Sequence, residues 1–290
     1  MKLLERIDRY ERLMRLDKPI GILLLLWPTL WALWIAAQGH LDWPTVAIFV
    51  LGTVLMRSAG CVLNDIADRK FDGKVARTQN RPLVTGEVSV REALYLTLIL
   101  VLLAFVLVLF LNTETILMSI PALFLAATYP YTKRFLSIPQ AYLGLAFGFG
   151  ILMAFMAIWQ TIPSFAWWLL AANIFWAIAY DTEYAMVDRD DDLKIGIKSS
   201  AIFFGRFDVL AVMLCYGAML ACLVMLGRTL SLGFYYYGGL GLAAVLAVYH
   251  YSLIKNREPY QCFKAFLNNS WLGGVIFIGI LMQYYFTKAT

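Results

Sequence analysis

NDIADRKFDGKVARTQNRP, residues 64–82, places a dense group of charged side chains directly after two long apolar runs. Its carboxylates Asp65, Asp68 and Asp72 stand three and four residues apart, so a helix carries all three on one face, with Asn64 beside them. The whole chain of 290 residues is 61% hydrophobic and only 15% charged, whereas a soluble domain carries about 25% charged residues. The acids therefore mark the edge between a membrane-embedded region and water.

Outward from this stretch, apolar segments recur along the chain. Nine runs of roughly 17 to 25 residues are each long enough to cross the ~30 Å hydrocarbon core as a helix. The sequence therefore predicts an all-α polytopic membrane protein, with one domain over residues 1–290 built from two groups of four helices plus a ninth. The predicted spans begin near Pro19, Trp43, Ala93, Thr115, Phe135, Ile162, Phe207, Thr229 and Ala265.

Basic residues indicate the orientation of these spans, because loops retained in the cytoplasm collect Lys and Arg. If the spans alternate, all but three of the 24 basic residues lie on the side of the N-terminus and of the acidic loops; the exceptions are Arg57, Arg228 and Lys288. We therefore place the N-terminus and these loops in the cytoplasm. The net charge of +5 suits a surface over the anionic lipid of a bilayer and requires no nucleic acid partner.

Three local patterns complete the predicted architecture. Residues 1–18 place Leu3, Ile7, Tyr10 and Met14 on one stripe among charged neighbours, which is typical of an amphipathic helix lying on the membrane. Gly144 and Gly148 are four residues apart within one span, a spacing that favours close helix packing. The four cysteines are scattered and form no CxxC pair, so we interpret them as packing residues.

A second acidic loop repeats the pattern of the first. In DTEYAMVDRDDD, residues 181–192, the carboxylates Asp181, Asp188 and Asp192 stand at i, i+7 and i+11. One such cluster is equally well interpreted as a solvated helix end, but two at the same membrane face favour a ligand site. Oxygen ligands suit Mg²⁺, which also shares phosphate oxygens. We therefore predict Mg²⁺ ions with a diphosphate between them, held by Asn64, Asp65, Asp68, Asp72, Asp188 and Asp192.

Basic side chains near both clusters are candidates for contact with the diphosphate, although any one of them can instead be an anchor at the cytoplasmic face. The predicted diphosphate ligands are Lys74, Arg77, Lys133, Arg134 and Lys198; Arg81, Arg189 and Lys194 are further basic neighbours of the clusters.

Arg57 differs from these because it lies inside an apolar span, seven residues before Asn64 and on about the same helical face. A guanidinium in the membrane is costly without a partner. Arg57 is therefore either a paired structural residue or a ligand for an anionic group below the metals, and its planar fork matches a carboxylate.

At these residues the chain resembles the UbiA superfamily of membrane prenyltransferases, and most closely the branch that prenylates 4-hydroxybenzoate in ubiquinone synthesis. The family motif NDxxDxxxD begins at Asn64, DxxxD runs from Asp188 to Asp192, and YxxxK runs from Tyr129 to Lys133. The stretches LDKPIG, LLLWPTLWAL and RTQNRPL resemble that branch in particular. The similarity covers nearly the whole chain.

The resemblance implies nine transmembrane helices around a central cavity, an Asp-rich cytoplasmic cap, and a place in the bacterial inner membrane. It also implies Mg²⁺ dependence, a polyprenyl diphosphate donor such as octaprenyl diphosphate, and transfer to the ring carbon ortho to the hydroxyl of 4-hydroxybenzoate. The catalytic base is then Asp68 or Asp188, and the sequence leaves that choice open.

On the acceptor side, Arg57, or alternatively Arg134, is the predicted clamp for the carboxylate of 4-hydroxybenzoate, and Tyr129 and Asp181 are predicted to bind the acceptor as well. An allylic cation has to be shielded from water, and aromatic walls both shield and stabilise it. The candidate wall residues are Tyr129, Tyr131, Phe147 and Tyr180.

Two other interpretations stay open at this point. Relatives that prenylate haem, chlorophyllide or naphthoate share the Asp motifs, so the acceptor itself rests on the resemblance. A transporter is the alternative from another class, but its ionisable residues are expected near the bilayer midplane, whereas here they concentrate at the cytoplasmic rim. A non-catalytic scaffold gives no reason for two periodic acid clusters.

Overall fold

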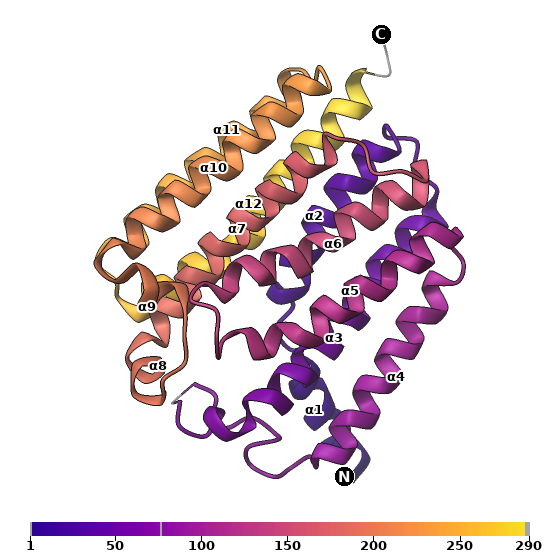
Figure 1. The fold of residues 1–290 in the computed structure, drawn as a ribbon. Coiled ribbons are helices and arrows are strands. Elements are labelled where there is room, and N and C mark those ends of the chain that lie inside the picture. Colours follow the sequence, from indigo (N-terminus) through magenta and orange to yellow (C-terminus); the bar gives the residue numbers. More distant parts are fainter. Residues whose placement is uncertain (1, 76, 288–290) are drawn as a thin grey trace.

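The computed structural model describes residues 2–75 and 77–287, with side chains from residue 5 onward; Lys288, used above for the orientation, lies outside them. Over this part of the chain every regular element is helical, which confirms the all-α prediction (Figure 1). The elements are α1 (Lys2–Met14), α2 (Ile20–Ala36), α3 (Trp43–Asp72), α4 (Val90–Val108), α5 (Thr113–Thr132), α6 (Pro139–Trp159), α7 (Ala166–Val187), α8 (Arg189–Ile195), α9 (Ser200–Phe204), the 3₁₀ turn η1 (Gly205–Phe207), α10 (Asp208–Thr229), α11 (Phe234–Ile254) and α12 (Pro259–Thr287).

A long helix occupies each of the nine predicted apolar runs: α2 to α7 and α10 to α12. Seven helical segments of the described chain are long and apolar enough to cross a membrane. The others are α2, which is apolar but has only 17 residues, and α7, which carries Asp181 and Glu183. The protein is therefore a multi-pass membrane protein, and the count of nine spans stays a prediction.

Side-chain caps fix where several helices begin. Asp42 accepts a hydrogen bond from the backbone N–H of Thr45 at the start of α3, and Ser89 and Glu92 form a reciprocal capping box on α4. These caps satisfy backbone donors that a helix leaves unpaired at its N-terminus. Asn112 caps α5 and also donates to the carbonyl of Met156, 3.0 Å away, which ties α5 to the end of α6.

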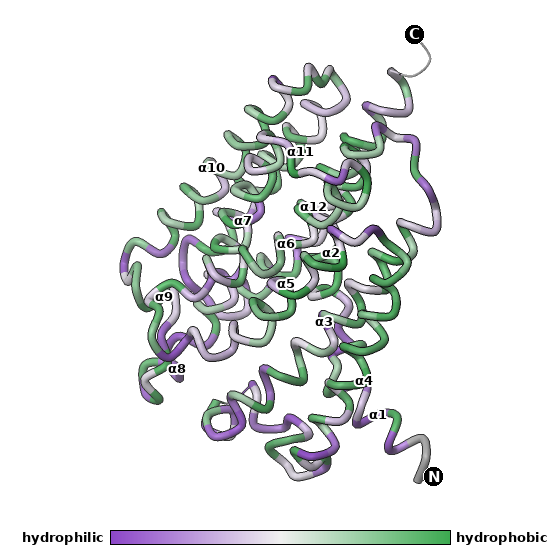
Figure 2. Tube along the Cα trace, turned by 45° about the vertical axis from the view of Figure 1, so that its right-hand side comes forward, coloured by the Kyte–Doolittle hydropathy of each residue, from purple (hydrophilic) through white to green (hydrophobic). Residues whose placement is uncertain are grey.

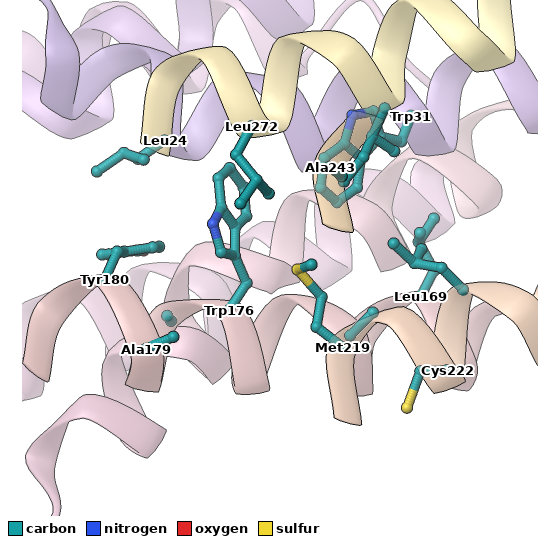
Figure 3. Packing of buried hydrophobic residues seen from close by; sticks show 14 of the residues in the cluster. Leu24, Trp31, Leu169, Trp176, Ala179, Tyr180, Met219, Cys222, Ala243 and Leu272 are labelled. Carbon is teal, nitrogen blue, oxygen red and sulfur yellow. The ribbon is translucent and has the colours of Figure 1, made fainter. Parts of the chain in front are cut away.

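The long helices form a closed bundle, because each packs on the next and α12 returns to α2. Contacts of α2 with α6 and of α7 with α12 make these four the inner helices of the bundle. Their buried aromatic rings fill it: Trp31 of α2 stacks on Trp176 of α7 at 5.4 Å between centroids, beside Leu272 of α12 (Figure 3). The four cysteines are free, which agrees with the packing interpretation.

The glycine pair of α6 packs directly against α7, as predicted. A Cβ at Gly144 would lie 2.7 Å from the Cα of Ile174, and one at Gly148 would lie 2.9 Å from Nδ2 of Asn173. Asn173 also donates a 2.8 Å hydrogen bond to the carbonyl of Gly144. Close approach of the two backbones therefore requires glycine here.

The N-terminal helix α1 is docked on the protein along part of its apolar stripe. Leu13 is completely buried against Val62 and Leu83, while Ile7 is 51% exposed. The Arg12 guanidinium hydrogen-bonds Glu87 and holds the pKa of that carboxyl below its ordinary value. Contact of the exposed part of the stripe with the membrane surface stays a prediction.

Polar residues gather most densely at one end of the bundle, where α1, α8 and the segment after α3 lie (Figure 2). Both acidic loops belong to this end, because α3 and α7 run toward it and end at Asp72 and Val187. The fold therefore brings the two motifs to one face of the molecule.

Candidate active site

A cavity of about 1250 Å³ opens at the polar end and extends into the bundle between the inner helices and α3, α4 and α5. Asp68 of α3 and Asp188, which caps α8, both line it. The predicted site residues on its wall are Arg57, Asn64, Asp65, Asp68, Asp72, Arg77, Tyr129, Lys133, Phe147, Tyr180, Asp181, Asp188, Asp192 and Lys198.

Two of the predicted diphosphate ligands, Lys74 and Arg134, do not line the cavity. Lys74 is exposed in the turn after α3. Arg134 is also exposed: it donates to the carbonyl of Ala67 at 2.9 Å and lies over the Phe71 ring. The cavity lining therefore does not support these two residues as diphosphate ligands, since side chains that follow the end of a helix no longer share one direction.

Two further basic residues are paired with other carboxylates, and one aromatic candidate lies outside the cavity. Arg189 is paired with Asp208 at 3.0 Å, and Lys194 with Asp191 at 3.2 Å. Tyr131, proposed above as a cavity wall, is 47% exposed and does not line the cavity.

Each of the two central carboxylates is paired with a basic side chain on the cavity wall. Lys133 Nζ lies 3.1 Å from Oδ2 of Asp68 and 3.3 Å from Oδ1 of Asn64. Arg77 donates from Nε to both oxygens of Asp188 at 3.1 Å and from its terminal nitrogen to Oδ2. Cations and anions thus alternate around the mouth, so the wall offers both oxygen ligands for a metal and nitrogen donors for a phosphate.

Asp65 and Asp72 are paired with arginines, whereas Asp68 is paired with Lys133. Arg81 Nη1 lies 3.0 Å from Asp65 Oδ1 and 2.6 Å from Asp72 Oδ2. Arg15, at the end of the N-terminal segment, adds a bidentate pair with Asp65 at 2.9 and 3.0 Å. These two carboxylates therefore hold the N-terminal segment and the loop after α3 against the rim of the cavity.

Spacing alone does not distinguish these pairings, because Asp65, Asp68 and Asp72 share one helical face. All three stay predicted ligands of the metal. Arg15 was missed altogether, because nothing in the sequence around it relates it to Asp65, 50 positions away.

The donor set fits a metal that shares its ligands with a substrate. Over the described residues, no group of three or more His, Cys, Asp or Glu side chains is able to hold a metal ion by itself. Mg²⁺ keeps several waters and usually binds through one or two carboxylates plus phosphate oxygens, so fewer protein ligands suffice. Burial raises the pKa of Asp192 to about 7, and the neighbouring Asp188 carboxylate adds to that shift.

The deeper part of the cavity contains a buried guanidinium with an unused donor. Arg57 donates from Nη1 to the sulfur of Cys61 at 2.7 Å, while its buried Nε has no hydrogen-bond partner. A Cβ at Gly21 would lie 2.6 Å from that Nε, so the glycine makes room for the group. Asp181 lines the same cavity and is hydrogen-bonded by Gln140.

Helices α4 and α5 line the apolar part of the cavity. Phe105 and Leu123 line the cavity and are nevertheless 41% and 38% exposed. Small side chains widen this part: Ala104, Ala122, Ala126 and Ala146.

A helical membrane bundle whose polar mouth carries paired carboxylates and cations, and whose interior is apolar, fits the class of intramembrane enzymes that act on a lipid with a charged head. Within that class the chain belongs to the UbiA prenyltransferase family, which it matches over residues 25–279. It is therefore a membrane prenyltransferase.

Among its curated relatives is the 4-hydroxybenzoate octaprenyltransferase of Methylobacillus flagellatus, 63% identical over 98% of this chain and 96% of the relative. The protein of the same description from Dechloromonas aromatica is 63% identical over 97% of this chain and 95% of its own length. These identities extend over the cap and the bundle alike.

Solved structures share the fold. The apo structure of a UbiA homologue from Aeropyrum pernix K1 superposes with a TM-score of 0.79 at 25% identity, covering 90% of this chain and 97% of that one. The UbiA homologue from Archaeoglobus fulgidus bound to GPP and Mg²⁺ gives a TM-score of 0.67 at 18% identity, over 97% of this chain and 100% of that one. The predicted all-helical prenyltransferase architecture is thereby confirmed.

Proposed function

We propose that this protein transfers a polyprenyl group from polyprenyl diphosphate, octaprenyl diphosphate in particular, to the ring carbon ortho to the hydroxyl of 4-hydroxybenzoate, a step of ubiquinone synthesis. The observation that carries the proposal is one cavity with two chemically different ends. Its mouth holds Asp68 and Asp188, each beside a cation, and its interior holds the unpaired donor of Arg57. The curated relatives named above support this choice of substrates.

The mouth binds the diphosphate of the donor. Lys133 and Arg77 provide charged nitrogen donors there, and Lys198 lines the same wall. Asn64, Asp68, Asp188 and Asp192 would hold Mg²⁺, which when bound supplies positive charge to the leaving diphosphate. The lysine and arginine side chains stabilise the same charge as it grows during cleavage of the allylic C–O bond.

Transfer of the prenyl group to the ring needs no reactant besides the two substrates. The allylic C–O bond breaks, and the electron pair leaves with the diphosphate. The ring carbon ortho to the phenol hydroxyl forms the new C–C bond, and its proton passes to a carboxylate, Asp68 or Asp188. Tyr129 and Phe147 line the cavity, and their rings shield the cation from water.

The interior binds the aromatic acceptor. Arg57 lies two helical turns below Asn64 on α3, so a carboxylate that it holds places the aromatic ring between the guanidinium and the diphosphate. Tyr129 and Asp181 line the wall at this level. Arg134, the alternative clamp, is exposed outside the cavity, which favours Arg57.

The polyprenyl tail occupies the apolar part of the cavity and leaves it between α4 and α5. The partly exposed side chains of Phe105 and Leu123 on this wall give the tail contact with lipid. We place the mouth at the cytoplasmic face of a bacterial inner membrane, where the basic loops lie.

A transporter requires ionisable residues on a path through the bilayer. Glu183 and His250 are buried in the bundle, but they are paired with each other at 3.3 Å and do not line the cavity. Nothing observed here therefore favours transport over transfer.

The test is turnover in membranes supplied with labelled 4-hydroxybenzoate, Mg²⁺ and a series of polyprenyl diphosphates. We expect prenylated product from the wild type and none from Asp68→Ala or Asp188→Ala, with all proteins present in the membrane. Asp190→Ala is the matched control, because Asp190 is an exposed acid of the same loop that does not line the cavity. Retained turnover in either cavity variant contradicts the proposal.

A further inference from the structure

Two polar groups of the cavity wall lack a hydrogen-bond partner among the described side chains: Nε of Arg57 and the hydroxyl of Tyr180. Tyr180 is only 1% exposed. Buried polar atoms in proteins are almost always hydrogen-bonded, and an exception calls for a specific explanation. Two unpaired donors on the wall of one ligand cavity point to a shared ligand.

The two groups lie at the same depth on different helices. Arg57 precedes Asn64 by seven residues on α3, and Tyr180 precedes Asp188 by eight residues on α7. Both helices run toward the polar end, so a rise of about 1.5 Å per residue puts both side chains roughly 10 to 12 Å below the Asp motifs. Both residues line the same cavity.

Packing fixes the Tyr180 ring and so limits where its hydroxyl can point. Trp176 contacts the ring edge to face at 5.4 Å and 87° (Figure 3). Phe266 packs against the same ring at 6.3 Å. The neighbouring carboxylate, Asp181, is already hydrogen-bonded by Gln140. The ring therefore has a defined position beside the cavity, and its buried hydroxyl has no hydrogen-bond partner among the described residues.

We propose that the Tyr180 hydroxyl donates a hydrogen bond to the carboxylate of the aromatic acceptor, beside Arg57, and that Tyr180 is thereby a residue that determines acceptor specificity. A carboxylate has two oxygens, each able to accept, and it satisfies a guanidinium and a phenol donor at once. The assignment rests on the proposed function, since it assumes an acceptor that carries a carboxylate. Shielding of the cation requires only the ring of Tyr180, so this assignment gives the hydroxyl a separate role.

Tyr180→Phe separates these two roles, because it keeps the ring and removes only the hydroxyl. We expect the KM for 4-hydroxybenzoate to rise about tenfold or more, as for loss of a hydrogen bond to a charged group, with the KM for polyprenyl diphosphate unchanged. Tyr142→Phe is the control: its hydroxyl pairs with that of Thr128 at 2.6 Å and lies off the cavity. Thermal unfolding of the purified variants in detergent verifies that they are folded.

Inhibition by benzoate identifies which end of the acceptor the hydroxyl contacts, because benzoate has the carboxylate and lacks the phenol. We expect its inhibition constant to rise in Tyr180→Phe by the same factor as the KM for 4-hydroxybenzoate. An unchanged KM overturns the assignment, and so does a raised KM with unchanged inhibition by benzoate. Failure of the proposed function is distinct, since the wild type then prenylates no 4-hydroxybenzoate at all.

Discussion

Lys133 Nζ lies 3.1 Å from Oδ2 of Asp68 and 3.3 Å from Oδ1 of Asn64, so the residue that follows α5 reaches the first acidic motif on α3. The lysine is the cation that joins two sequence motifs in one cavity wall. Its ammonium balances the charge of Asp68, and it is also placed to contact a diphosphate that shares this region.

Lys133→Gln tests that second role. We expect kcat to fall on the order of 10²-fold, the usual effect of removing one preorganised donor from a developing charge, and the KM for polyprenyl diphosphate to rise. The KM for 4-hydroxybenzoate should change little, because the acceptor lies deeper. Steady-state kinetics in detergent or liposomes measure all three constants.

Arg134→Gln provides the comparison for Lys133→Gln, because Arg134 is adjacent in sequence but exposed and directed at the Phe71 ring. Near wild-type kinetics are expected for it. An equal fall in kcat in the two variants would show that turnover of polyprenyl diphosphate depends on positive charge at the helix end and not on a contact in the cavity.

We expect Asp65→Asn to lower stability and Asp68→Asn to lower turnover. Asp65→Asn removes the charge that faces Arg15 and Arg81, and breaking a buried ion pair on one side costs about 3–5 kcal/mol. We therefore expect a lower unfolding temperature for Asp65→Asn. Asp68→Asn should keep its stability and lose Mg²⁺-dependent turnover.

Thermal unfolding and turnover against Mg²⁺ concentration, measured on both variants, separate the two outcomes. If Asp65→Asn unfolds like the wild type and loses turnover as Asp68→Asn does, the division of the first motif into structural and metal-binding acids is wrong.

Much of the fold was predictable from hydropathy, because the lipid environment constrains every span in the same way. Each apolar run had to become a helix to satisfy its own backbone in lipid, and α3 does begin at Trp43 as expected. The spacing of Gly144 and Gly148 likewise predicted a close helix contact, since only their small size permits it.

The partners of individual charges were not predictable, because they come from distant segments. Arg15 pairs with Asp65 across 50 positions, and Arg77 with Asp188 across 111. Periodicity shows which face a carboxylate occupies but not which cation the fold brings to it. Glu183 was overlooked for the same reason: its partners lie on three other helices, so nothing near it in the sequence marks it as buried.

Gly144→Val should disturb the bundle without touching the cavity chemistry. The new side chain would meet the backbone of α7 at Ile174, and overpacking of this kind costs about 1–3 kcal/mol. We expect a lower unfolding temperature and an unchanged KM for both substrates in the protein that remains folded. Gly217→Val is the control, because a Cβ there has nothing within 4 Å; a loss of stability as large as in Gly144→Val would contradict the packing argument.

Glu183 on α7 is fully buried and serves as a junction of the C-terminal helices. It accepts hydrogen bonds from Tyr216 of α10 at 3.0 Å and from Asn269 of α12 at 2.8 Å, and its carboxylate lies 3.3 Å from Nδ1 of His250 on α11. Four helices are therefore joined through one side chain, on the side of α7 away from Asp181.

Glu183→Ala leaves three buried polar groups without their common partner, so we expect a loss of about 3–5 kcal/mol in the free energy of unfolding. Glu183→Gln combined with His250→Gln replaces the Glu183–His250 contact by two neutral amides that still donate and accept. A neutral pair of similar shape is often tolerated where a broken pair is not, and we therefore expect the double variant to regain most of the stability. Thermal unfolding of the single Ala variant and the double Gln variant decides the matter. A double variant as unstable as Glu183→Ala would mean that the junction depends on charge and not on hydrogen bonding.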